Sequence, residues 1–509
     1  MSVISESNKR IAKNTMFLYF RMLLTMGVSL YTVRVVLNTL GDIDYGIFNV
    51  VGGIVVMFAF LSNTMSSASQ RFFSFELGVK NQERLKKIFS ITVTIYIGIA
   101  IVIFFLAETF GLWFLNNKMN IPVERMEAAR WVYQCSIFSF IVTMFAIPYN
   151  ASIIAHERMN VYAWLSIVEV LLKLLAVYLL VLFSFDKLKL YSVLILFITV
   201  IIALFYISYC ARKYEECRFR LFWNARLFKE IVSYSGWNLF GALSSVCKGQ
   251  GINIVLNMFL GPVVNTARGI AYQVDTLLLN FGNNFFMAVR PQIIKQYAAN
   301  ERAEWEKLVF RSSKFAFFML WCLSLPLLLE TDFVLKLWLK NAPQQYTVIF
   351  TKLVIIDTLL ELLMNPVVTL VQATGKIKIY QIIVGGVRLL NLPIAYFLLS
   401  WGFSPIMVFY AMIINTLICS MLRLFMANWL IKFTISGFVK YVLIRICIVS
   451  AISFIASKSI QILWNPDNLI IKSASLIFLS IIVSVICIAG FGLNKNEQKM
   501  IYKRLIKFL

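Results

Sequence analysis

Apolar residues follow one another in runs of about twenty along most of this chain, and short polar or basic segments separate the runs. A helix of about twenty residues rises roughly 30 Å, which matches the hydrocarbon thickness of a bilayer. The pattern therefore predicts an all-α polytopic membrane protein with about fourteen transmembrane helices. The predicted spans are 14–40, 45–68, 87–115, 129–155, 160–184, 189–211, 232–260, 262–289, 310–330, 345–373, 378–401, 405–431, 439–462 and 469–492.

One stretch of this pattern occurs twice, because residues 148–180 match residues 366–398 at a constant offset of 218. Each copy reads as an apolar helix, a tight polar turn and a second apolar helix, which indicates an internal duplication. The duplication pairs the fourth span with the tenth. A shift of six spans is even, so both halves face the same way and the repeat is parallel. The matching positions include Pro148 with Pro366, Ala155 with Ala373, Tyr162 with Tyr380, and Tyr178 with Tyr396.

Basic residues set the orientation of the predicted spans. With the N-terminus inside, about thirty Lys and Arg residues fall in cytoplasmic segments and about nine in external loops, so both termini are predicted to be cytoplasmic. The chain then divides into an N-lobe (1–211, spans one to six), a cytoplasmic amphipathic linker (212–231), a C-lobe (232–432, spans seven to twelve) and two accessory helices with a basic tail (433–509).

Composition changes this picture only in detail. The chain has 509 residues, of which 60% are hydrophobic and 14% charged, and 48 Lys and Arg residues against 24 Asp and Glu give a net charge of +24. In a soluble protein that excess suggests nucleic acid, but here the positive-inside rule explains it, so no nucleic-acid partner is expected. The eight cysteines follow no ligand spacing and there is a single histidine, so we expect no metal and no cofactor.

Charged side chains inside the spans mark where chemistry occurs, because each costs a few kcal/mol unless it faces a cavity or a partner. Polar residues recur at helical spacing on three helices, which predicts one shared cavity between the halves. Its fixed charges are mostly positive, so an anionic ligand is expected, and guanidinium groups suit phosphate. The three stripes are Arg21, Thr25, Ser29 and Thr32; Asn238, Gly241, Ser245 and Lys248; and Arg268, Tyr272 and Asp275.

Other intramembrane charges have competing interpretations. Arg34 and Arg388 are further candidate cavity cations, although Arg34 lies near a span end and snorkelling to the interface explains it equally well. Glu169 and Lys173, four residues apart, pair with each other or take part in ion coupling. Asp275 is a proton carrier or a counter-ion for a neighbouring cation.

Asp42 and Asp44 form a D-x-D in the first predicted external loop. Membrane glycosyltransferases that use lipid-linked sugars carry such a pair, which makes a glycosyltransferase or polymerase the alternative from another class. In those enzymes the pair sits in a long folded segment, whereas this predicted loop has only a few residues. We therefore expect the two aspartates to shape a turn.

The segment from Arg34 to Gly41, the run Tyr45-Gly46-Ile47-Phe48 and the pair Gln70-Arg71 resemble the opening of the polysaccharide-exporter branch of the multidrug/oligosaccharidyl-lipid/polysaccharide (MOP) flippase superfamily, nearest to the Wzx-like O-antigen flippases. The resemblance implies a flippase of the bacterial inner membrane and not an enzyme. It implies an undecaprenyl-diphosphate-linked oligosaccharide as substrate, moved by alternating access for O-antigen and lipopolysaccharide assembly, with polysaccharide polymerase and assembly proteins as partners besides the lipid bilayer.

By helix position, Arg21, Lys248 and Arg268 correspond to the cationic lumen of that family. The multidrug branch typically carries a membrane-embedded acid in its first helix for cation coupling, and the first span here has none. This difference argues against a cation-coupled multidrug exporter, which stays as one alternative. A lipid II-type flippase, which also has fourteen helices and a cationic cavity, is the other.

Overall fold

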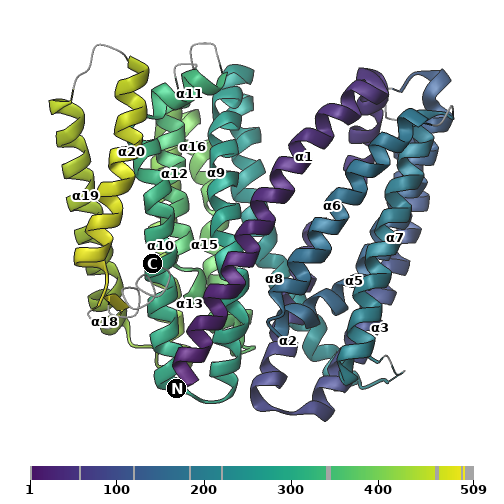
Figure 1. The fold of residues 1–509 in the computed structure, drawn as a ribbon, viewed down its shortest axis with the longest axis horizontal. Coiled ribbons are helices and arrows are strands. Elements are labelled where there is room, and N and C mark those ends of the chain that lie inside the picture. Colours follow the sequence, from purple (N-terminus) through teal and green to yellow (C-terminus); the bar gives the residue numbers. More distant parts are fainter. Residues whose placement is uncertain are drawn as a thin grey trace. The chain divides into compact units, whose positions relative to one another are not determined.

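The structure is a computed structural model that describes residues 3–56, 59–117, 121–182, 185–218, 220, 222–339, 346–464, 469–494 and 497–498. Helices and the turns that join them make up this part of the chain (Figure 1). The chain divides into two compact units. Unit 1 comprises residues 1–242 and 287–301, and unit 2 comprises residues 243–286 and 302–509.

Unit 1 is built mainly around α5, which packs on α7, α2, α3 and α1, while α6 packs on α1 and α7. Two helices run from one unit into the other, because α8 (Ala225–Val246) begins in unit 1 and α9 (Ile252–Ala298) ends there. The other elements of unit 1 are α1 (Val3–Val56), α2 (Ala59–Val79), α3 (Gln82–Leu106), η1 (Ala107–Gly111), α4 (Leu112–Asn117), η2 (Val123–Arg125), α5 (Met126–Ala155), α6 (Met159–Leu182), α7 (Lys187–Lys213) and η3 (Glu215–Cys217).

In unit 2, α12 packs on α17 and α10, and α16 packs on α17. The elements are η4 (Cys247–Gly251), α10 (Arg302–Leu329), α11 (Thr331–Leu339), α12 (Thr347–Leu363), α13 (Asn365–Ala373), α14 (Lys378–Tyr380), η5 (Gln381–Gly385), α15 (Gly386–Leu389), α16 (Asn391–Ser400), α17 (Pro405–Ile431), α18 (Ile435–Phe438), η6 (Val439–Leu443), α19 (Ile444–Leu463), α20 (Leu469–Cys487) and η7 (Ile488–Gly492). The predicted lobe boundaries at 211 and 232 do not coincide with the unit boundaries, and the lobe assignment stays a prediction.

Ten helices in the described residues are long and apolar enough to cross a membrane, which confirms an all-helical, multi-pass membrane protein. Each corresponds to one predicted span. The four other predicted spans, 14–40, 45–68, 232–260 and 262–289, fall in α1, α2, α8 and α9, outside these ten. The ten are 82–117, 123–155, 159–180, 187–213, 302–329, 347–373, 378–400, 405–431, 435–463 and 470–492.

Two predicted breaks between spans are wrong. Helix α1 is continuous through Gly41, and α9 is continuous through Pro262. A glycine inside a helix costs only about 1 kcal/mol, and a proline removes one hydrogen bond and bends a helix without necessarily ending it. At 54 residues α1 would extend about 80 Å if straight, more than twice the hydrocarbon core, so it includes segments outside the bilayer.

The turn predicted at Asp42 and Asp44 is therefore also wrong, since both lie in α1. The side chain of Asp42 lies outside the described residues, whereas the Asp44 carboxylate accepts two hydrogen bonds from Arg125. Arg125 also donates to Asp186, 2.7 Å away, and Asp186 caps the start of α7 through the amide of Leu188. Burial disfavours the charged form of Asp186, but the hydrogen bonds from Arg125 and the backbone outweigh it and lower its pKa.

The accessory helices α19 and α20 pack on α10 within unit 2. Trp321 of α10 donates to Ser453 of α19 over 2.9 Å, and the Glu330 carboxylate at the end of α10 accepts from Gln461 and Ser473 at 2.7 and 2.8 Å. The indole, hydroxyl and amide groups thus form hydrogen bonds between helices. In a low-dielectric environment an unpaired polar group would be costly. Most of the basic tail predicted after these helices lies outside the described residues.

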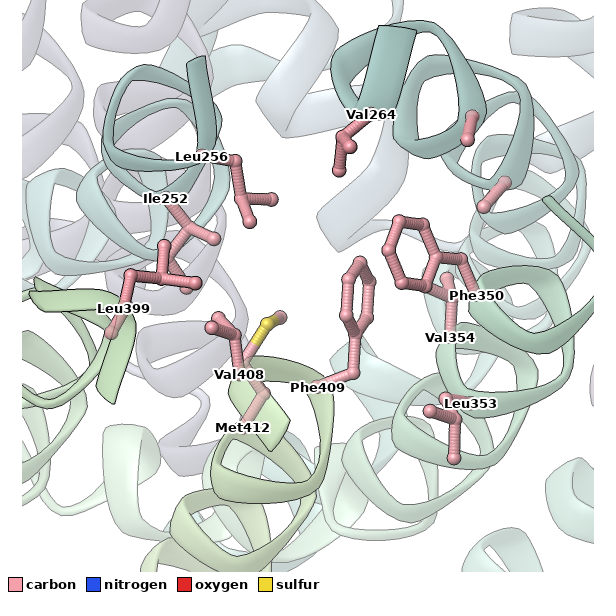
Figure 2. Packing of buried hydrophobic residues seen from close by; sticks show 13 residues of the cluster. Ile252, Leu256, Val264, Phe350, Leu353, Val354, Leu399, Val408, Phe409 and Met412 are labelled. Carbon is pink, nitrogen blue, oxygen red and sulfur yellow. The ribbon is translucent and has the colours of Figure 1, made fainter. Parts of the chain in front are cut away.

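An apolar cluster forms a core of unit 2 between α9, α12, α16 and α17 (Figure 2). Phe350 of α12 stacks on Phe409 of α17 with ring centroids 4.1 Å apart, and Val354 and Met412 continue the same contact along both helices. Each of these side chains is nearly or fully buried. The cluster therefore fixes the relative register of α12 and α17, which carry the polar groups described below.

The close packing of α2 on the C-terminal end of α9 in unit 1 can be tested by substitution of a glycine at the contact. A Cβ at Gly78 would lie 2.6 Å from the Lys295 carbonyl oxygen, whereas a Cβ at Gly98 of α3 meets nothing within 4 Å. Gly78→Ala should destabilise the protein by about 1–3 kcal/mol because the backbone must move. Gly98→Ala should be neutral or slightly stabilising. Apparent melting temperatures in detergent measure both, and equal values for the two variants would contradict the packing of α2 on α9.

Candidate anion-binding site

Lys248 lies in the π-helical turn η4 and is the centre of a polar network inside unit 2. Its ammonium group lies 2.7 Å from an Asp357 oxygen, 3.0 Å from the Thr416 hydroxyl and 3.5 Å from a Glu361 oxygen. The Thr416 hydroxyl in turn donates to the other oxygen of Asp357 at 2.5 Å. The ammonium group thus donates two hydrogen bonds and has a second carboxylate nearby, which compensates its burial.

Arg388 of α15 is the second cation of this network. Its guanidinium forms an ion pair with Glu361 and donates to the Ser245 hydroxyl over 2.6 Å. One carboxylate, Glu361, thus connects Arg388 with Lys248. Because Asp357 and Glu361 are four residues apart on α12, they lie on one face of that helix.

Pro393 accounts for the local shape around Arg388. A proline cannot donate to the carbonyl four residues earlier and its ring clashes with it, so α15 ends at Leu389 and α16 begins at Asn391. Side chains add hydrogen bonds beside this break, since Asn391 donates to the Arg388 carbonyl at 2.9 Å and Asn415 donates to the Val387 carbonyl at 2.7 Å. This interruption has no equivalent in α6, where the duplication places Leu175.

Close approach of η4 to α16 positions Lys248. A Cβ at Gly251 would lie 2.4 Å from a methyl group of Leu392, so only glycine fits without a shift of that side chain. Lys248 precedes the core residue Ile252 by four residues, and Asp357 and Thr416 follow Leu353 and Met412 by four. The charged network therefore begins one helical turn beyond the apolar cluster of Figure 2.

Arg268 and Asp275 of α9 lie in the same unit. The Arg268 side chain is buried, donates to the Gly249 carbonyl at 2.5 Å and places its guanidinium 4.0 Å from the centre of the Tyr272 ring. The Asp275 carboxylate accepts a hydrogen bond from Thr358, the neighbour of Asp357. The carboxylates that pair with Lys248 are thus Asp357 and Glu361.

The remaining candidates belong to unit 1. Arg21 of α1 places its guanidinium 4.9 Å from the Tyr162 ring centre. Glu169 and Lys173 form an ion pair at 2.6 Å, with each side chain more than a third exposed. The hydroxyls of Thr25 and Thr32 donate to carbonyls of their own helix, Met22 and Val28, so these two positions of the predicted stripe are satisfied locally. The side chain of Arg34 lies outside the described residues.

The sequence analysis overlooked Asp357 and Glu361. The signal was present, because two acids four residues apart stand within the apolar run 345–373, and an intramembrane acid is a candidate functional residue in its own right. The site residues predicted from the sequence are mostly cations, because the prediction started from the strongly positive net charge. Within the described ranges, no three His, Cys, Asp or Glu side chains group closely enough to hold a metal ion.

Solved structures of membrane transporters share this fold. A multidrug resistance MATE family transporter of the MOP superfamily in an outward-facing conformation aligns with 84% of this chain and 98% of its own, with a TM-score of 0.70 and 12% identity. A MOP superfamily transporter from Pyrococcus furiosus aligns with 84% of this chain and 96% of its own, with a TM-score of 0.66 and 12% identity. The Vibrio cholerae MATE transporter VcmN in its bent form aligns with 87% of this chain and 100% of its own, with a TM-score of 0.64 and 16% identity.

The chain therefore shares the fold of MOP superfamily transporters. The chain belongs to the polysaccharide biosynthesis protein family, whose sequence profile matches residues 11–297, more than half of its length. The chain is thus a member of this family with a fold similar to that of MOP superfamily transporters, which confirms the resemblance at this level. No curated protein matches the chain with significance.

The ion pair between Lys248 and Asp357 predicts a stability test. Lys248→Met should destabilise the protein by about 3–5 kcal/mol, because it leaves a carboxylate unpaired in a buried site. Adding Asp357→Asn should recover much of the loss, since the second change removes that charge. Lys336→Met is the control, because its ion pair with Asp332 is more than half exposed. Apparent melting temperatures measure all four proteins, and a double variant no more stable than Lys248→Met would contradict the pairing.

Proposed function

We propose that this protein is a flippase that moves undecaprenyl-diphosphate-linked oligosaccharides across the bacterial inner membrane by alternating access, for O-antigen or related surface polysaccharide. Membership of the polysaccharide biosynthesis family and the MOP fold support transport in that pathway. The observation that carries the choice of ligand is the buried cation pair Lys248 and Arg388, held within reach of one shared carboxylate. A diphosphate bears at least two negative charges and needs such a group of donors to leave water.

The proposal includes fourteen spans with both termini in the cytoplasm and two lobes related by a parallel repeat. Helices α7 (187–213) and α17 (405–431) begin and end 218 residues apart, the offset found in the sequence, and α5 and α13 end at Ala155 and Ala373 with the same offset. These bounds support the duplication. Arg21, Lys248 and Arg268 would then face the ligand pathway, with Arg34 as a further candidate, and polymerase and assembly proteins would receive the product.

A second candidate is a cation-coupled exporter of small molecules. The observation that favours it is the set of intramembrane carboxylates Asp275, Asp357 and Glu361, because such groups can bind and release protons or metal cations during transport. A lipid II-type flippase shares the diphosphate chemistry and differs only in its sugar. Loss of drug resistance in a deletion strain that keeps its surface polysaccharide would favour the exporter.

Charge reversal tests the flippase directly. Lys248→Glu and Arg21→Glu should each reduce surface polysaccharide roughly tenfold or more, because repulsion adds to lost attraction, and tenfold corresponds to ~1.4 kcal/mol. Lys248→Arg should be milder because it keeps the charge. Arg445→Ala is the control, since the Arg445 guanidinium donates to the Gly492 carbonyl over 3.4 Å and Arg445 is not one of the candidate site residues. The readout is polysaccharide per amount of membrane protein in a strain that lacks its own copy, and normal export by both Glu variants would refute the proposal.

Single-cysteine labelling tests the proposed topology. In a cysteine-free background, Lys87→Cys and Arg220→Cys should react only after the membrane is permeabilised, because both positions fall in basic segments assigned to the cytoplasm. Lys187→Cys, at the opposite end of α7 from Lys213, should react with an impermeant maleimide on intact cells. Labelling of position 220 from outside would overturn both the span count and the orientation.

A further inference from the structure

Glu361 is placed where an anionic ligand would bind. Its two oxygens face different cations, one contacting Arg388 and the other lying 3.5 Å from Lys248. A guanidinium fork with an ammonium group beside it is the donor set that proteins use for phosphate, and the Ser245 hydroxyl 2.6 Å from Arg388 adds a neutral donor at its edge. A carboxylate in such a set makes the contacts that a phosphate oxygen pair would otherwise make.

The two carboxylates of α12 are held differently. Asp357 is fixed by Lys248 at 2.7 Å and by Thr416 at 2.5 Å, so both of its oxygens are engaged by elements of the core. Glu361 is held by the side chains of Arg388 and Lys248. Its side chain is 30% exposed, compared with 9% for Lys248 and 13% each for Asp357 and Arg388. Glu361 is thus the most exposed of these four side chains.

We propose that Glu361 occupies the phosphate subsite of the unliganded protein, and that a diphosphate-bearing lipid binds by displacing it from Arg388 while Asp357 keeps its contact with Lys248. This inference rests on the proposed function and makes Glu361 a specificity-determining residue of that site. The exchange replaces one anion by another, so neither cation is left unpaired. An unpaired cation in a low-dielectric site would cost several kcal/mol. The ligand gains only the difference between its own contacts and those of Glu361.

Release follows from the same exchange. When Glu361 returns to Arg388, the phosphate loses its guanidinium contact, and the carboxylate remains covalently tethered at high local concentration. The competitor therefore limits the affinity of the site and allows the lipid to leave. Without the charge of Glu361 the site should bind diphosphate more tightly and turn over more slowly, a combination that a merely structural role does not produce.

The test measures binding of farnesyl diphosphate to the purified full-length protein in detergent, with Glu361→Gln as the variant. The amide is close in shape to the carboxylate but carries no charge, so its Kd should be roughly tenfold lower than that of the wild type, equivalent to ~1.4 kcal/mol. Surface polysaccharide in cells should fall although the membrane holds as much protein. Asp332→Asn, which removes the carboxylate of an exposed ion pair in the same unit, should change neither quantity.

The outcomes separate this inference from the proposed function. A wild type that binds farnesyl diphosphate and a Glu361→Gln variant that binds it no more tightly would overturn the displacement and leave the flippase standing. Binding by neither protein would overturn both. If Glu361→Gln fails to fold, Glu361→Asp replaces it, because a shorter carboxylate competes less well for Arg388 and should also lower the Kd. An Asp variant with the wild-type Kd would then overturn the inference.

Discussion

The structure of unit 2 depends on how it keeps two cations in an apolar helix bundle. An ammonium or guanidinium group removed from water loses far more solvation energy than the fold can supply, unless anions and hydrogen-bond acceptors replace the water. Here two carboxylates one turn apart on α12 do so, and Lys248 and Arg388 meet them from η4 and α15. The positions of three chain segments are therefore coupled, because moving any one of them separates opposite charges.

Irregular backbone is the means by which the helices reach this arrangement. The π-turn at Lys248, the glycine contact at Gly251 and the break before Pro393 all lie within a few residues of the cations. Regular helices would satisfy their own backbone groups but would leave no room for η4 against α16. Beside the break, Asn391 and Asn415 donate to the carbonyls of Arg388 and Val387. Distortion of this kind is concentrated at functional sites and is tolerated in membranes only where protein surrounds it.

The predicted site residues are mostly cations, but in the structure Lys248 and Arg388 are paired with the carboxylates Asp357 and Glu361. Under the proposed function this charge balance matters, because an unopposed cation pair would hold a diphosphate too tightly to release it. Counter-ions on the protein lower that affinity without removing the donors that recognise phosphate. The apolar cluster around Phe350 and Phe409 begins one helical turn away, and apolar surroundings strengthen the attraction within an ion pair.

The sequence by itself determined the class of this protein, because the bilayer imposes a length and an apolarity that composition and run length report directly. Run lengths placed ten spans, and the offset of 218 residues reappears in the bounds of α7 and α17. The tertiary structure alone decided which charges neutralise each other. Asp357 is 109 residues from Lys248, and Glu361 is 27 from Arg388, so no local pattern joins them. It also decided that helix continues through Gly41 and Pro262, because breakers lower helix stability by amounts that packing overrides.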